Sequence, residues 1–185
     1  SLAGLTAVPV KSGAEGILTP DAVRAVMDED TAGIMITNPN TLGLFERHIK
    51  EIADIVHEKG GFVYCDGANM NALLGAARLG DMGVDVVHMN LHKTFSTPHG
   101  GGGPGSGPVG VKKILEPFLP VPRILKVGTR YVLDSDRADS IGKIHSFYGN
   151  FGMHVRAYTY IRMHGARGLR EVGENAILNA NYLLS

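Results

Sequence analysis

The chain has 185 residues, of which 44% are hydrophobic, with 18 basic and 18 acidic side chains. This length allows one sizeable domain with a hydrophobic core, and no apolar run reaches membrane-spanning length. The balanced charge shows no electrostatic signature of a nucleic-acid or membrane partner. Because Cys65 is the only cysteine, no internal disulfide is possible and a reducing, cytoplasmic location is expected.

Two segments early in the chain predict helices. Thr19 can cap a helix whose first residue is Pro20, a residue suited to the first helical turn. Residues 42–61 predict a longer helix, because apolar side chains recur every three or four positions and Gly60 can supply a left-handed stop. The apolar side chains of this face are Phe45, Ile49, Ile52 and Val56.

Compact apolar runs predict strands at 32–37, 62–65 and 84–89. The runs are separated by helical patterns, and this alternation predicts a parallel sheet covered on both faces. A later strand is expected at 108–113. The expected fold class is therefore α/β, with a parallel-rich sheet flanked by helices.

The end of the chain predicts helices again. Prolines within 116–122 mark a change of course before the polar stretch 131–140. Residues 150–185 have helical spacing that is interrupted at Gly165 and Gly168, which predicts two helices.

Part of a longer protein is expected, because the sequence starts without Met and stops within a helical pattern. Residues 1–185 would be part of one large domain. In this division, 1–120 form a sheet core with the ligand site, and 121–185 form a connection and helices toward a further C-terminal domain.

Polar side chains follow each predicted strand. In an open parallel sheet, ligands bind beyond the carboxyl ends of the strands, so these side chains are expected to meet at one edge. They offer an acid, a lysine and several neutral donors. The residues are Asn38 after the first strand, Asp66, Ala68 and Asn69 after the second, and Asn90, His92 and Lys93 after the third.

This set matches the needs of pyridoxal phosphate. The aldehyde of that cofactor requires a lysine for a Schiff base, and its pyridine nitrogen requires a carboxylate to stay protonated, which makes Lys93 and Asp66 the candidates. The phosphate needs donors such as Asn90 and His92, and the phenolic oxygen needs an amide or hydroxyl such as Asn69.

Three segments resemble a known family. "YCDGANMNALLG", "HMNLHKTF" and "PHGGGGPGSGPVGVKK" together are similar to glycine decarboxylase, the P-protein of the glycine cleavage system, which is a fold-type I pyridoxal phosphate enzyme. The resemblance extends through "TNPNTLGLFE" and "FYGNFGMHVRAYTYIR", and therefore covers nearly the whole chain. The tail most resembles the second subunit of the two-subunit bacterial form.

The resemblance implies specific roles. Lys93 would be the Schiff-base lysine, Asp66 would pair with the pyridinium nitrogen, and Ala68 would pack its methyl group on the ring. By wider analogy with fold-type I enzymes, the residues near the phenolic oxygen and phosphate would be Asn69, Asn90 and His92.

The implied activity is decarboxylation of glycine, followed by transfer of the aminomethyl group to the oxidised lipoyl arm of the H-protein, which makes the overall enzyme an oxidoreductase. The implied partners are glycine, the lipoylated H-protein and a companion P-protein subunit in a hetero-oligomer. The resemblance places ring stacking and part of the phosphate grip before Ser1. This piece alone is therefore expected to be inactive.

Two rival functions stay open. Another fold-type I enzyme, such as a cysteine desulfurase or an amino-acid decarboxylase, would share the lysine and the carboxylate. A non-catalytic scaffold subunit is the other rival, because the family contains a homologous half without its own cofactor. Retention of Lys93 and Asp66 argues against the scaffold.

Two other motifs, a group of histidines and a GxGxxG pattern, give weaker indications of function. His88, His92 and His99 straddle a strand end and a turn without an accompanying ligand pattern, so no metal is expected, and His88 is expected to face the core. Residues 105–110 fit GxGxxG but lack a preceding strand and contain a proline, which argues against a dinucleotide site.

Two features stay ambiguous. Seven of the eleven residues at 100–110 are glycine, and they predict either an adaptable loop near the site entrance or simple turn chemistry. Asn38 would either contact substrate or only form the turn in "NPN".

Overall fold

The computed structural model describes residues 3–100, 102–103 and 105–185. Two residues of the predicted glycine-rich loop, Gly101 and Pro104, lie outside the described residues, as do Ser1 and Leu2. The elements in chain order are α1 (Pro20–Arg24), β1 (Gly33–Thr37), α2 (Ile49–Glu58), β2 (Phe62–Gly67), η1 (Leu79–Met82), β3 (Val86–Met89), β4 (Val109–Val111), η2 (Lys113–Phe118), β5 (Arg123–Val127), β6 (Arg130–Asp134) and α3 (Phe151–Leu184).

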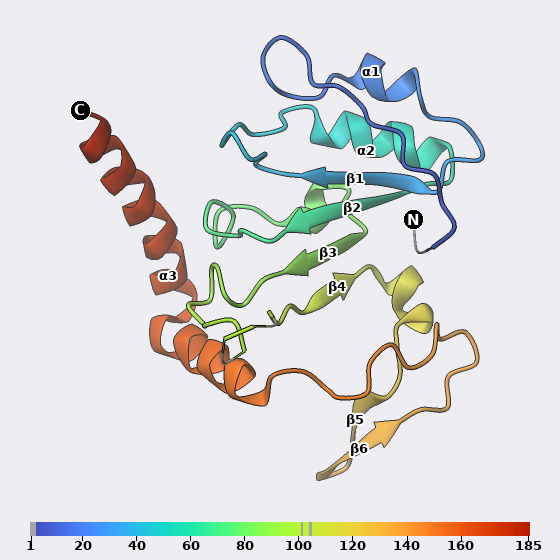
Figure 1. Ribbon diagram of the computed structural model, residues 1–185, viewed down its shortest axis with the longest axis vertical. Helices are drawn as coiled ribbons and strands as arrows, with labels where there is room; N and C mark the ends of the chain where they lie inside the picture. Colours follow the sequence, from blue (N-terminus) through green and yellow to red (C-terminus); the bar gives the residue numbers. More distant parts are fainter. Residues whose placement is uncertain (1–2, 101, 104) are drawn as a thin grey trace.

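The main sheet has the strand order β1-β2-β3-β4. β1, β2 and β3 are parallel, and β4 pairs with β3 in the antiparallel direction. Figure 1 shows the arrowheads of the three parallel strands at one edge and that of β4 pointing the opposite way. The three predicted parallel strands and the later strand are confirmed, and the register places Thr37, Asp66 and His88 side by side.

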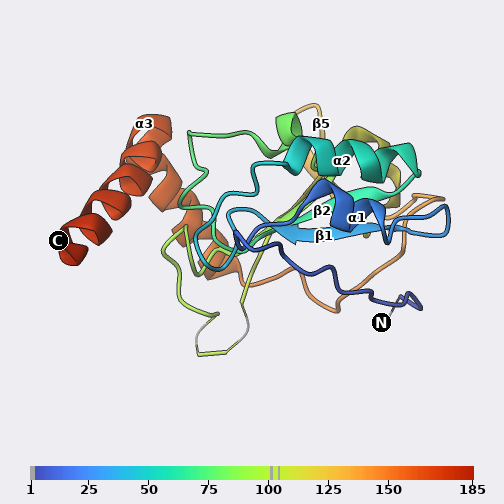
Figure 2. The same ribbon diagram turned by 90° about the horizontal axis from the view of Figure 1, so that it is seen from above.

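Helix α2 packs on one face of the sheet, and α1 packs against α2 (Figure 2). The predicted cap of α1 is confirmed, because Thr19 Oγ1 accepts a hydrogen bond of 3.3 Å from the Ala22 N–H. The longer helix begins later than predicted, at Ile49, so Phe45 lies outside it with 45% of its surface exposed. Gly60 has the left-handed φ of 79° that ends the segment, as predicted.

The core lies between α2 and the sheet. Ile52 and Val56 of α2 are fully buried, and Val63 and Cys65 point toward them from β2. Because side chains alternate along a strand, Tyr64 and Asp66 of β2 point to the opposite face.

No helix of the described ranges covers that opposite face, which differs from the predicted covering on both faces. Met35 and Phe62 are 66% and 40% exposed there. The reason lies in the connections. A glycine-rich loop rather than a helix leads from β3 to β4, and α3 lies beyond the carboxyl ends of the parallel strands instead of across the sheet (Figure 1).

The region after residue 120 differs from the prediction in one element. β5 and β6 form an antiparallel hairpin where only a connection was expected. Its turn uses Gly128 at a φ of 61°, and Glu116 forms ion pairs with Arg123 and Arg137 at its base. The second strand contains Tyr131, Val132 and Leu133, which favour a strand, but the polar residues that follow them led the whole of 131–140 to be assigned to a connection.

The predicted break in the tail is confirmed at Gly165, whose φ of 61° and ψ of −175° interrupt α3, whereas Gly168 stays helical. In the part of the chain that the structure describes, no helix is both long enough and apolar enough to cross a membrane.

Candidate functional site

The loops that follow β2 and β3 are joined at the carboxyl edge of the sheet. The Met70 N–H donates a hydrogen bond of 2.8 Å to Thr94 Oγ1, a buried atom of the second loop. This contact holds 68–70 against 90–97. It therefore brings together two of the three predicted clusters of polar residues, as the parallel topology implies.

Asp66 has one oxygen engaged and one open. Its Oδ1 accepts a hydrogen bond of 2.9 Å from the Ala68 N–H and lies 3.3 Å from Nε2 of His88. Within the described ranges, Oδ2 has no hydrogen-bond or ion-pair partner, and the side chain is 29% exposed. The carboxylate is thus anchored through one oxygen and can accept a proton or donor from a ligand through the other.

Lys93 lies in a tight turn and is exposed. Its N–H donates to the Asn90 carbonyl, and its own carbonyl accepts from the Ser96 N–H, both at 3.4 Å. Ser96 has a φ of 57°, in the left-handed region that residues other than glycine seldom adopt. Such strained backbone occurs often at functional sites, and here it lies three residues after the candidate lysine.

The imidazole of His92 carries an unsatisfied nitrogen. Its Nδ1 is buried without a hydrogen-bond partner in the described part of the chain, and its ring stacks on His99 with centroids 3.7 Å apart. Burial, followed by the charges of His99 and Lys93, lowers the pKa of His92, so the ring is neutral at pH 7. An orphaned buried nitrogen is costly unless a ligand satisfies it.

The other predicted site residues differ in burial and in whether their side chains already have hydrogen-bond partners. Asn69 is exposed, and its Oδ1 accepts a 3.0 Å hydrogen bond from the Asn71 N–H. Ala68 and Asn90 are half-buried. Asn38 is buried, and its Oδ1 accepts from the Glu46 N–H at 3.0 Å, so the structure uses this amide in the turn after β1.

His88 does not face the core, and that prediction is wrong. Its side chain is 23% exposed on the face without helices, and Nδ1 lies 2.8 Å from the hydroxyl of Tyr64. Sequence reasoning missed Tyr64 and His88 as members of the site. The alternation along β2 could have linked Tyr64 to Asp66, but only the register with β3 adds His88.

The glycine-rich loop packs closely on the site. A Cβ on Gly105 would lie 2.8 Å from Cε1 of His92, and one on Gly107 would lie 2.3 Å from the Met89 carbonyl oxygen. Glycine is therefore required at 107, where the neighbour is backbone, whereas a side chain at 105 would force the His92 ring to move. Ser106 links the loop to α3, because its Oγ lies 2.8 Å from Nε2 of His154.

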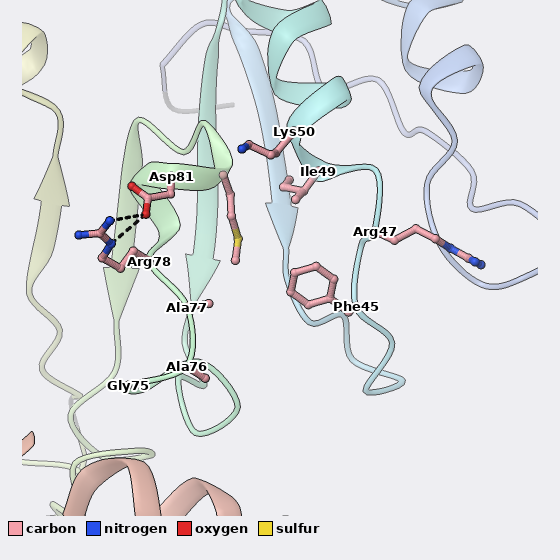
Figure 3. A pocket seen from close by; sticks show the side chains of 10 residues that line it. Phe45, Arg47, Ile49, Lys50, Gly75, Ala76, Ala77, Arg78 and Asp81 are labelled. Carbon is pink, nitrogen blue, oxygen red and sulfur yellow. Dashed lines mark hydrogen bonds and ion pairs between the residues drawn. The ribbon is translucent and has the colours of Figure 1, made fainter. Parts of the chain in front are cut away.

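Two hollows flank this edge. One of about 520 Å³ lies between the loop and α3 and is lined by Leu91, Ser106, Gly107, Pro108, Tyr148, Gly149, His154, Ala157, Tyr158 and Ile161. The other, of about 700 Å³, lies between the start of α2 and 75–82 (Figure 3), and neither Asp66 nor Lys93 is among its lining residues. There Arg78 pairs with Asp81 at 2.8 Å, and Arg47 points away from that pair.

Comparison with known proteins gives a family and several relatives. The family described as aminotransferase class-V matches residues 1–103. A "Probable glycine dehydrogenase (decarboxylating) subunit 2" of Halalkalibacterium halodurans is 61% identical over 100% of this chain and 38% of its own length. Proteins of the same name from Bacillus licheniformis and Caldanaerobacter subterraneus are each 60% identical, over 100% and 99% of this chain and 38% of their lengths.

Solved structures with the same fold are more distant in sequence. An apo cysteine desulfurase of Thermococcus onnurineus has a TM-score of 0.58 at 17% identity, over 86% of this chain and 39% of that protein. A sphingosine-1-phosphate lyase of Burkholderia pseudomallei has a TM-score of 0.56 at 16% identity, over 86% and 36%. The predicted fold class, a parallel-rich sheet of the fold-type I kind flanked by helices, is confirmed.

Proposed function

The chain belongs to the aminotransferase class-V family, and we propose that the protein containing it decarboxylates glycine with pyridoxal phosphate and passes the aminomethyl group to the lipoyl arm of the H-protein. The observation that carries this proposal is about 60% identity over the whole chain to proteins named glycine dehydrogenase (decarboxylating) subunit 2. The chain spans 38% of the length of these relatives. The proposal therefore concerns the complete protein.

The residues at the sheet edge fit pyridoxal phosphate. An exposed lysine, a carboxylate with one open oxygen and a buried imidazole nitrogen without a partner lie on joined loops. These are the groups that an aldehyde, a ring nitrogen and a phosphate require.

Each residue then has a definite task. The Nζ of Lys93 would hold the cofactor covalently and leave when glycine takes its place, and Oδ2 of Asp66 would hold a proton at the ring nitrogen. Ala68 would pack against the ring. The cofactor, when bound, would supply an electron sink for the electron pair that stays on the α-carbon of glycine when CO2 leaves.

The amides and the imidazole would orient the cofactor. Asn69 is proposed to contact its phenolic oxygen, while Asn90 and His92 contact its phosphate. A neutral His92 would donate one ring N–H to the phosphate, because phosphate oxygens accept hydrogen bonds.

The wider assignments follow the same relatives. A subunit numbered 2 in their names supports a companion subunit in a hetero-oligomer. We assign residues 1–120 to the sheet core that carries the cofactor and 121–185 to a connection and helices toward a C-terminal domain. A cytoplasmic location fits the single thiol, Cys65, which is buried.

The rival enzymes differ in substrate. The fold likeness to a cysteine desulfurase comes at 17% identity and supports the fold alone. The scaffold hypothesis predicts no covalent cofactor at all. Both rivals are therefore open to direct tests.

Reduction with borohydride tests the lysine. In the complete protein, loaded with pyridoxal phosphate, peptide mapping should find the pyridoxyl mark on Lys93. Lys112 is the internal comparison, because its Nζ is held 2.8 Å from Oδ1 of Asp85 and should stay unmarked. A mark on Lys112, or none, would reject the assignment.

Exchange of labelled bicarbonate into glycine tests the reaction. The complex with its companion subunit and lipoylated H-protein should catalyse exchange, whereas this chain alone should not. A cofactor-loaded complex that releases sulfur from cysteine but performs no exchange would support the desulfurase and contradict glycine decarboxylation.

A further inference from the structure

His88 bridges two side chains of the neighbouring strand on the face of the sheet that carries no helix. Its Nε2 lies 3.3 Å from Oδ1 of Asp66, and its Nδ1 lies 2.8 Å from the hydroxyl oxygen of Tyr64. Asp66 and His88 are register partners across β2 and β3, and Tyr64 precedes Asp66 by two residues. The sheet itself therefore sets the three side chains in one row.

The chemistry of the three groups fixes the protons. A carboxylate oxygen accepts, so the 3.3 Å contact with Oδ1 of Asp66 favours the tautomer of His88 that carries a hydrogen on Nε2. With a neutral ring, Nδ1 is then an acceptor, and the Tyr64 hydroxyl donates to it. Burial, followed by the charges of Asp66 and Cys65, raises the pKa of Tyr64, which keeps the hydroxyl protonated at neutral pH.

The contacts to the Asp66 carboxylate reach only one of its two oxygens. Both the His88 contact and the Ala68 N–H address Oδ1, and no group of the described ranges addresses Oδ2. A carboxylate that is contacted on one oxygen by a backbone N–H and an imidazole nitrogen has the orientation of its plane restrained. Its second oxygen is then presented in a defined direction.

We propose that His88, backed by Tyr64, is the positioning residue that fixes the orientation of the Asp66 carboxylate and aims Oδ2 at the ring nitrogen of the cofactor. This inference rests on the proposed function for the identity of that cofactor. His88 touches neither substrate nor cofactor and acts only through Asp66. Tyr64 acts one step further back by fixing the tautomer of His88.

The test compares two ligands in the complete apo complex. One is pyridoxal phosphate, and the other is its deaza analogue, in which a carbon replaces the ring nitrogen. His88→Leu should weaken binding of pyridoxal phosphate about tenfold, because Asp66 loses the side chain that orients it, and change binding of the analogue less than about twofold. Absorbance titration measures both affinities without turnover.

Two variants separate positioning from simple packing. His88→Gln keeps a side-chain N–H that can donate to Asp66, so it should recover most of the affinity for pyridoxal phosphate. Tyr64→Phe should lower that affinity by about threefold and leave the analogue unchanged, because His88 keeps its ring but loses its fixed tautomer. If His88→Leu does not fold, the affinities of these two variants for pyridoxal phosphate and for the deaza analogue test the role of His88 instead.

His57→Leu is the matched control. It removes a histidine contact to a different carboxylate, Asp85, with the Nε2 to Oδ2 distance at 2.7 Å, and should alter neither affinity by more than about twofold. Equal losses for both ligands, or none for either, would overturn the role of His88. Absence of bicarbonate exchange by the wild-type complex would instead reject the proposed function. The affinities of parent and variants for the two ligands could still be compared, because absorbance titration does not depend on turnover.

Discussion

Two aspartates lie near opposite ends of the same strand pair, and both contact a histidine. Asp85, just before β3, is 5% exposed, and both of its oxygens are occupied. Oδ2 lies 2.7 Å from Nε2 of His57 and accepts from the Val63 N–H at 2.7 Å, while Oδ1 lies 2.8 Å from Nζ of Lys112. Asp66, at the carboxyl end of β2, is engaged through Oδ1 alone.

The difference shows how one residue type serves two purposes. A buried carboxylate with every acceptor filled stabilises the join between a helix and strands, because removing any partner leaves an unpaired charge. A partly exposed carboxylate with one open oxygen can still bind a ligand through that oxygen. The number of unfilled acceptor positions therefore distinguishes the structural aspartate from the candidate catalytic one.

The largest expected effect is on activity at the Asp66 end. Asp66→Asn should lower bicarbonate exchange by about a hundredfold to a thousandfold, because an amide cannot hold a proton at the ring nitrogen as a carboxylate does. The amide oxygen can still accept from Ala68 and His88, so stability should change by less than about 0.5 kcal/mol. Exchange at matched cofactor occupancy measures this, and a parental rate would identify Asp66 as a turn residue.

Asp85→Asn should give the opposite pattern. Loss of the charge leaves Lys112 and His57 without their carboxylate, and since both partners are partly exposed we expect a cost of about 2 kcal/mol. Native-state hydrogen exchange of peptides covering 60–67 and 84–89 in the complete subunit measures it. Asp54→Asn, on the exposed side of α2, is the control and should leave protection unchanged.

Lowering the pH should remove the stability that Asp85 contributes. Burial by itself would raise the pKa of Asp85, but the hydrogen bonds from Lys112, the Val63 N–H and His57 outweigh burial and hold the pKa below its usual value. The stability that Asp85 contributes is therefore present above the unfolded pKa of about 3.9 and is lost as pH falls through the lower folded pKa.

In hydrogen exchange corrected for intrinsic rates, the difference in opening free energy between parent and Asp85→Asn should be constant from neutral pH to about pH 5 and shrink below about pH 4. A difference that persisted unchanged at low pH would mean that shape, not charge, explains the variant.

The smallest effect is expected in the glycine-rich loop. Gly105→Ala would place a methyl group 2.8 Å from Cε1 of His92 and should displace that ring, which weakens cofactor binding by about threefold without changing protection of β2 and β3. Gly103→Ala has nothing within 4 Å and is the matched control. Equal affinities in the two variants would show that His92 does not contact the phosphate.

The sequence by itself determined the local elements and the composition of the site edge. The Thr19 cap, the apolar period of α2 and the stop at Gly60 are local signals, and the structure contains each of them. The rule that ligands bind beyond the ends of parallel strands selected Asp66 and Lys93, because strand ends can be recognised in the sequence without knowing the register.

Only the tertiary structure decided which distant residues meet. His88 joined Tyr64 and Asp66 through the pairing of β2 with β3, since every residue of β3 is half-buried and its pattern does not reveal which face a side chain takes. The Asp85 cluster likewise joins residues more than twenty positions apart. The physical reason is that strand register and sheet facing are set by non-local pairing, whereas caps, turns and helical period are set by neighbours in the chain.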